Sequence, residues 1–126
     1  MNRIVTDKAA WSIAEVYATD IRQLKDSFNE WNGRPQDTSV GTSFGIPFLQ
    51  LKNNTKPIAF ASLIVNENGE IGYKIYQKSS ENPKIQTEWE QQVAMEFLEK
   101  RVAFKDAASL QSGILCLLNW LDYSCN

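Results

Sequence analysis

A chain of 126 residues has the length of one ordinary domain and can bury a hydrophobic core without cross-links. Its formal net charge is −2, and its Lys and Arg residues form no cluster, so we expect no nucleic-acid binding. The absence of histidine excludes Ser-His and Cys-His nucleophilic catalysis and His-ligated zinc.

Targeting signals and metal ligands are equally sparse. No apolar run is long enough to span a bilayer, and the N-terminal stretch has no apolar core of a secretory signal, so we expect a cytoplasmic protein without membrane contact. Cys116 and Cys125 lack the spacing of a metal site and are expected to be reduced. We therefore predict no metal, no cofactor and no catalytic residue.

The first predicted element is one long helix over residues 7–32. Gly33 and Pro35 end it. Its apolar residues recur in steps of three and four, which places them on one face for packing against a sheet. This face comprises Ala10, Ala14, Tyr17, Ile21, Leu24, Phe28 and Trp31.

The next segment, residues 33–47, permits two interpretations. Apolar residues from Val40 to Ile46 alternate with small ones, which is the pattern of an edge strand, but a loop fits the same residues. The bare face left by the small residues suggests close approach by another backbone or by a ligand. A ligand site here would be lined by Ser43, Phe44, Phe60, Tyr73 and Tyr76.

Three β-strands are predicted over residues 48–52, 58–65 and 70–77. Asn68-Gly69 predicts a two-residue type I′ turn between the last two strands. Pairing about that turn puts Phe60 on the same face as Tyr73, and places Tyr76 on the other face.

Two helices complete the predicted order. Thr87 and Glu90 predict a capping box at the start of one helix, which ends within residues 101–105. Asp106 caps another that runs to Tyr123. This last helix is apolar nearly all round, which favours burial in the domain or in a partner. The residues predicted to form such an interface are Ile114, Leu117, Leu118, Trp120 and Leu121.

These elements predict an α+β fold in one domain, residues 1–126. An antiparallel sheet of three to four strands is packed by a long N-terminal helix and two C-terminal helices.

Two stretches resemble the acyl-CoA N-acyltransferase (GNAT-like) superfamily. TDKAAWSIAEVYATDIRQL is similar to the first helix of that family, and PIAFASLIVNENGEIGYKIYQ to its central hairpin. The resemblance implies that the backbone of residues 70–77 holds the pantetheine arm of acetyl-CoA. It also implies that a glycine-rich turn binds the pyrophosphate at the start of the next helix. The corresponding stretch, KSSENPKIQTEWE, contains no glycine and carries three glutamates.

Three functions follow from these patterns. The first is a non-catalytic protein-interaction or oligomerisation module that associates with itself or with another protein. The second is a degenerate acyltransferase-like protein that binds CoA. The third is a module that binds another small ligand between residues 39–45 and the sheet.

Overall fold

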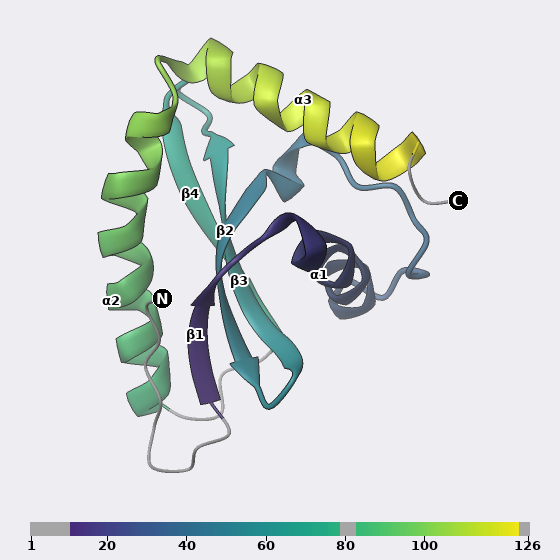
Figure 1. Cartoon of the computed structure of the whole chain (residues 1–126), viewed down its shortest axis with the longest axis vertical. Helices are drawn as coiled ribbons and strands as arrows, with labels where there is room; N and C mark the ends of the chain where they lie inside the picture. Colours follow the sequence, from purple (N-terminus) through teal and green to yellow (C-terminus); the bar gives the residue numbers. More distant parts are fainter. Residues whose placement is uncertain (1–10, 79–82, 124–126) are drawn as a thin grey trace.

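The computed structural model describes residues 11–78 and 83–123. Its elements are β1 (Trp11–Glu15), α1 (Ala18–Trp31), the 3-10 helix η1 (Thr42–Phe44), β2 (Ile46–Asn53), β3 (Lys56–Val65), β4 (Ile71–Gln77), α2 (Pro83–Lys100), the 3-10 helix η2 (Arg101–Ala103) and α3 (Ala107–Tyr123). The strands form one antiparallel sheet in the order β1-β2-β3-β4 (Figure 1). Within the described residues, no helix is long and apolar enough to cross a membrane.

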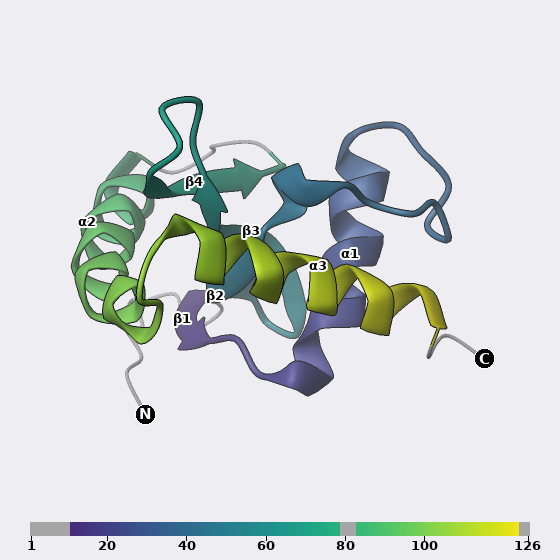
Figure 2. The same ribbon diagram turned by 90° about the horizontal axis from the view of Figure 1, so that it is seen from above.

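Helices cover both faces of the sheet, which confirms the predicted α+β class. α2 lies on one side and α1 on the other, while α3 crosses one end of the sheet (Figure 2). The core on the α2 side joins Trp89 and Val93 to the sheet and to Leu110 and Ile114 of α3. The core on the α1 side contains Ile21, Leu24, Phe28, Val40, Phe44, Phe60 and Leu121. α3 thus contributes to both cores.

The predicted long helix is wrong at its start, because residues 11–15 form a strand. Ile13 is buried opposite Leu51 of β2, whereas its neighbours are half-buried, and residues 7–10 lie outside the described part. α1 begins at Ala18 because Tyr17 is extended and its N–H donates to the Asp20 carboxylate over 2.9 Å.

The segment from Val40 to Ile46 is a loop with one 3-10 turn, so the edge-strand interpretation is wrong. Asn29 of α1 is fully buried and binds the loop that lies between α1 and Val40. Its Nδ2 donates to the carbonyl oxygens of Gln36 and Thr38 over 3.1 and 2.7 Å. Because α1 fixes this loop, the chain enters β2 only at Ile46.

The three predicted strands are confirmed, but the predicted two-residue turn between β3 and β4 is wrong. The loop has three residues, 67–69, and Gly69 alone has a positive φ, +77°. The side-chain oxygen of Asn66 accepts hydrogen bonds from the N–H groups of Asn68 and Glu70, which stabilises this longer loop.

The extra loop residue shifts the register by one and exchanges the faces of β4. Phe60 pairs with Tyr76, and Leu63 pairs with Tyr73. The prediction that Tyr73 shares a face with Phe60 is therefore wrong, because a shift of one residue turns every side chain of a strand over.

The C-terminal helices differ in how well their starts were predicted. α2 begins at Pro83, where a proline needs no N–H partner, so the capping box at Thr87 is wrong. The Thr87 hydroxyl donates to the Pro83 carbonyl over 3.0 Å. The cap of α3 is confirmed, since the Asp106 carboxylate accepts the N–H of Ser109 over 2.9 Å.

Candidate functional site

Four of the five residues predicted to bind a ligand lie on the α1 side of the sheet. The rings of Phe44, Phe60 and Tyr76 pack in tilted pairs, with centroids 5.5 Å apart for Phe44 and Phe60 and 5.3 Å for Phe60 and Tyr76. The Tyr76 hydroxyl donates to the carbonyl oxygen of Ser43. Tyr73 lies on the opposite face, beside Phe97 of α2 at 4.8 Å between centroids.

These four residues differ in their exposure to solvent. Phe44 and Phe60 are fully buried and cannot contact a ligand from solvent. Ser43 and Tyr76 reach the surface and line a hollow of about 530 Å³. Burial of the Tyr76 side chain raises the pKa of its hydroxyl above 10.0.

The hollow lies where η1, the β3–β4 hairpin and α3 meet. It is lined by Thr42 and Ser43, by residues 64–68, by Lys74 and Tyr76, and by Gln111. Apart from Ser43 and Tyr76, these residues were not predicted from the sequence. The correct loop length would have placed Lys74 and Tyr76 on the face of Phe60, but nothing in the sequence indicated that Gln111 of α3 reaches the same place.

Gly45 sets the distance between η1 and β3. Its φ is +67°, a conformation that favours glycine, and a methyl group at this position would overlap the carbonyl oxygen of Leu63. It would also come within 2.9 Å of Ile64 and 3.0 Å of Ser62. Glycine therefore lets η1 lie directly on β3, which forms one wall of the hollow.

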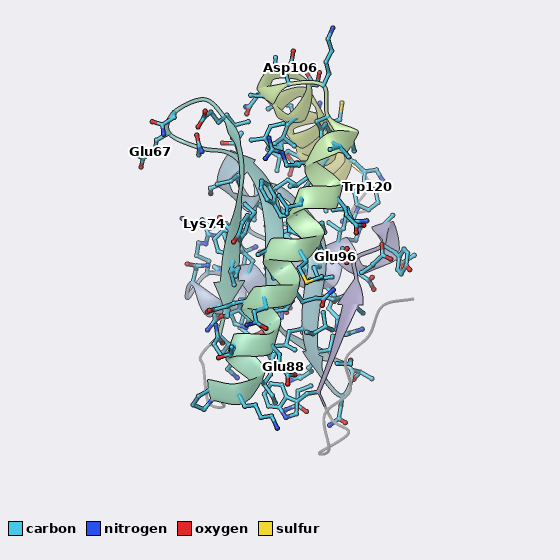
Figure 3. The ribbon with its side chains drawn as sticks, turned by 90° about the vertical axis from the view of Figure 1, so that its left-hand side faces the viewer. Glu67, Lys74, Glu88, Glu96, Asp106 and Trp120 are labelled. Atoms are coloured by element: carbon cyan, nitrogen blue, oxygen red, sulfur yellow. The ribbon has the colours of Figure 1, made fainter. Side chains whose placement is uncertain are left out.

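Two side chains of opposite charge line the hollow. The Lys74 ammonium lies 5.6 Å from the centroid of the Tyr76 ring, and Glu67 extends from the hairpin loop. Figure 3 shows both on the same side of the molecule, along β4 and at the hairpin tip. Among the described residues, neither Lys74 nor Glu67 forms an ion pair.

A second candidate site is the outer face of α2 and η2. Met95, Leu98 and Val102 are 63%, 62% and 78% exposed, and their spacing of three and four residues places them on one side of the helix. We call these three residues the apolar stripe. They lie opposite the buried residues of the helix, which include Trp89 and Val93.

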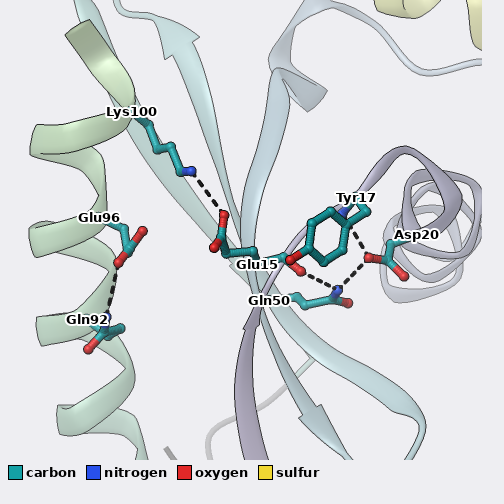
Figure 4. A network of polar contacts seen from close by, with 7 residues as sticks. All are labelled: Glu15, Tyr17, Asp20, Gln50, Gln92, Glu96 and Lys100. Carbon is teal, nitrogen blue, oxygen red and sulfur yellow. Dashed lines mark hydrogen bonds and ion pairs between the residues drawn. The ribbon is translucent and has the colours of Figure 1, made fainter. Parts of the chain in front are cut away.

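One inner position of α2 is occupied by a carboxylate. Glu96, between Met95 and Phe97, is only 5% exposed and points toward the sheet, where Gln92 donates to its carboxylate over 3.3 Å (Figure 4). A buried carboxylate beside three exposed large apolar side chains is unusual for a surface helix.

Polar contacts surround Glu15 at the end of β1. Lys100 of α2 forms an ion pair with the Glu15 carboxylate over 3.2 Å, and Gln50 donates to the Glu15 carbonyl and to the Asp20 carboxylate over 3.3 and 3.1 Å (Figure 4). The ion pair joins α2 to β1, and the Gln50 contacts join β2 to β1 and to α1.

The residues of α3 predicted to form an interface are mostly covered by this chain. Ile114 and Leu121 are buried in the two cores, and Leu117 and Leu118 are half-buried. Trp120 is 41% exposed and lies under the Arg22 guanidinium at 5.0 Å. The intramolecular cores thus account for most of the apolar character of α3.

Within the described residues, no three His, Cys, Asp or Glu side chains gather in a group that could hold a metal ion. Comparison with the models of known protein families, with curated proteins and with solved structures gives no match.

Proposed function

We propose that this chain is a non-catalytic interaction module that associates with a second copy of itself through the apolar stripe on α2. The observation that carries the proposal is the exposure of Met95, Leu98 and Val102 on one side of the helix, while Glu96 takes a buried position. Exposed apolar side chains gathered on one helix face are typical of protein-binding surfaces.

The charges beside the stripe favour a second copy as the partner. Glu90 and Arg101 are eleven residues apart, about three turns of 3.6 residues, so they lie on the same flank of the helix. When two such helices pack antiparallel about a two-fold axis near Met95, Glu90 of each copy faces Arg101 of the other. This arrangement makes the surface complementary to itself, as a two-fold interface requires.

The size of the stripe sets the expected affinity. Burying the exposed part of a Met, Leu or Val side chain contributes about 1–2 kcal/mol. Three such side chains from each copy then contribute about 6–12 kcal/mol, against an association cost of at least about 4 kcal/mol. We therefore expect a weak dimer, with a dissociation constant in the micromolar range or above.

The test is the molar mass measured by light scattering after size-exclusion chromatography. The unaltered chain is expected to run as a concentration-dependent dimer, and Leu98→Glu as a monomer with an unchanged circular dichroism spectrum. Leu115→Glu is the matched control, because Leu115 is 49% exposed but lies on α3. If both variants keep the mass of the unaltered chain, the stripe is not the interface.

CoA binding by an acyltransferase-like protein is the second candidate. The observation that favours it is the position of β4 at the end of the sheet, with no described strand on its other side. The family resemblance assigns the pantetheine arm to the backbone of this strand. Residues 79–82, in the stretch that would hold the pyrophosphate, lie outside the described residues.

A calorimetric titration with acetyl-CoA and with free CoA tests this candidate. Saturable heat at micromolar ligand would support it and make amine acetylation worth measuring. The absence of heat at ligand concentrations of about 1 mM, well above the usual affinity of a cofactor site, would remove it.

A further inference from the structure

We infer that the hollow beside η1 binds a small zwitterion, such as an α-amino acid with an aliphatic side chain. This inference goes beyond the proposed self-association, because the hollow and the apolar stripe share no residue. In this site the Lys74 ammonium binds the carboxylate of the ligand, the Glu67 carboxylate binds its ammonium group, and Ile64 contacts its side chain.

The two opposite charges that line the hollow have no ion-pair partner among the described residues. Lys74 and Glu67 line one hollow but do not pair with each other or with any other described residue. Opposite charges that line the same cavity unpaired can both be satisfied by a ligand that carries the complementary charges at its two ends. A dianion or polyanion fits less well, because the hollow offers one lysine and places Glu67 against additional negative charge.

The remaining lining suits a small polar molecule. Thr42 and Ser43 supply hydroxyl groups and Gln111 an amide, while Ile64 supplies apolar surface. A volume of about 530 Å³ lies within the usual range for small-molecule sites.

Several contacts organise the hollow before a ligand arrives. The Tyr76 hydroxyl is bonded to the Ser43 carbonyl, and the Lys74 ammonium lies against the Tyr76 ring. The hairpin loop that carries Glu67 is held by the two backbone hydrogen bonds to the Asn66 side chain, over 2.9 and 3.0 Å. A preorganised site loses less conformational entropy on binding.

The experiment is an NMR titration of the ¹⁵N-labelled chain with three matched compounds. Leucine carries both charges, 4-methylpentanoate lacks the ammonium group, and 3-methylbutylamine lacks the carboxylate. Leucine is expected to shift the amide resonances of residues 64–68 and of Lys74 in a saturable way. Each of the other two compounds is expected to bind at least about tenfold more weakly, because it loses one charge-assisted hydrogen bond.

Variants locate the site. Lys74→Met and Glu67→Gln are each expected to weaken leucine binding at least about tenfold. Lys56→Met and Glu30→Gln are the matched controls, because both residues are exposed and outside the hollow, and they are expected to leave the affinity unchanged. Absence of leucine-induced shifts, shifts confined to other parts of the chain, or equal binding of all three compounds would overturn the inference.

Discussion

Substitution of Gly45 by alanine tests whether the close approach of η1 to β3 holds this part of the fold together. Gly45 combines a φ of +67° with a ψ of −157°, a region essentially restricted to glycine, and an alanine there costs about 1–3 kcal/mol. The added methyl group also overlaps the Leu63 carbonyl and crowds Ile64 and Ser62, and such overpacking adds about 1–3 kcal/mol. We expect Gly45→Ala to lower the free energy of unfolding by about 2–6 kcal/mol.

Gly33→Ala is the control for a glycine with a positive φ and no close neighbour. Gly33 follows α1 with a φ of +70°, but no atom lies within 4 Å of its added methyl group. The control should therefore lose only the conformational part, about 1–2 kcal/mol. Urea unfolding followed by tryptophan fluorescence gives both values, and equal losses in the two variants would show that the close approach is not what restricts position 45.

Three further predictions concern single contacts. Tyr76→Phe removes the hydrogen bond to Ser43 and should lower the free energy of unfolding in urea by about 1 kcal/mol. The folded-state pKa of Tyr76 is raised above 10.0, so the neutral hydroxyl stabilises the fold fully below pH 10. This stabilisation disappears as the pH rises through the folded-state pKa. On alkaline titration, Tyr76→Phe should therefore lose less stability than the unaltered chain. Hydrogen bonding from Ser109 holds the pKa of Asp106 below 3.8, so the ionised carboxylate stabilises the fold fully above pH 3.8 and loses this effect as the pH falls through the lower folded-state pKa. In thermal melts, Asp106→Ala should have a lower melting temperature than the unaltered chain at about pH 7, and this difference should disappear in acid. Lys100→Met removes a partly exposed ion pair with Glu15 and should lower the free energy of unfolding by less than about 1 kcal/mol, and a larger loss would mean that this contact orients α2.

The sequence predicted those parts of the fold that depend on local patterns. The Asp106 cap and the buried positions Ile21, Leu24 and Phe28 follow from capping chemistry and helical periodicity, and the structure confirms them. Residues 11–15 were not predictable in the same way, because a short run with one buried residue fits a helix or a strand, and pairing with β2 decides between them.

The residues of the candidate site could not be predicted because the register of β4 differs by one residue from the predicted one. The Asn68-Gly69 pair is a strong signal for a two-residue turn, but the Asn66 side chain stabilises a three-residue loop. The longer loop places Tyr76 and Lys74 on the face of Phe60 and Tyr73 on the other face. The apolar stripe was missed for a different reason. Apolar periodicity favours a leucine over a glutamate at an inner position, and only the packing of α2 against the sheet shows that Glu96 is buried and Leu98 exposed.

Self-association is tested directly by sedimentation equilibrium of the full chain from about 1 μM to about 1 mM, the range in which a weak dimer dissociates. We predict a monomer–dimer equilibrium that Glu90→Arg and Arg101→Glu each weaken and that the double variant restores, because exchange of the two charges recreates the pair across the two-fold axis. A monomer at every concentration would contradict self-association, and a dimer that neither charge reversal weakens would contradict the antiparallel pairing of α2.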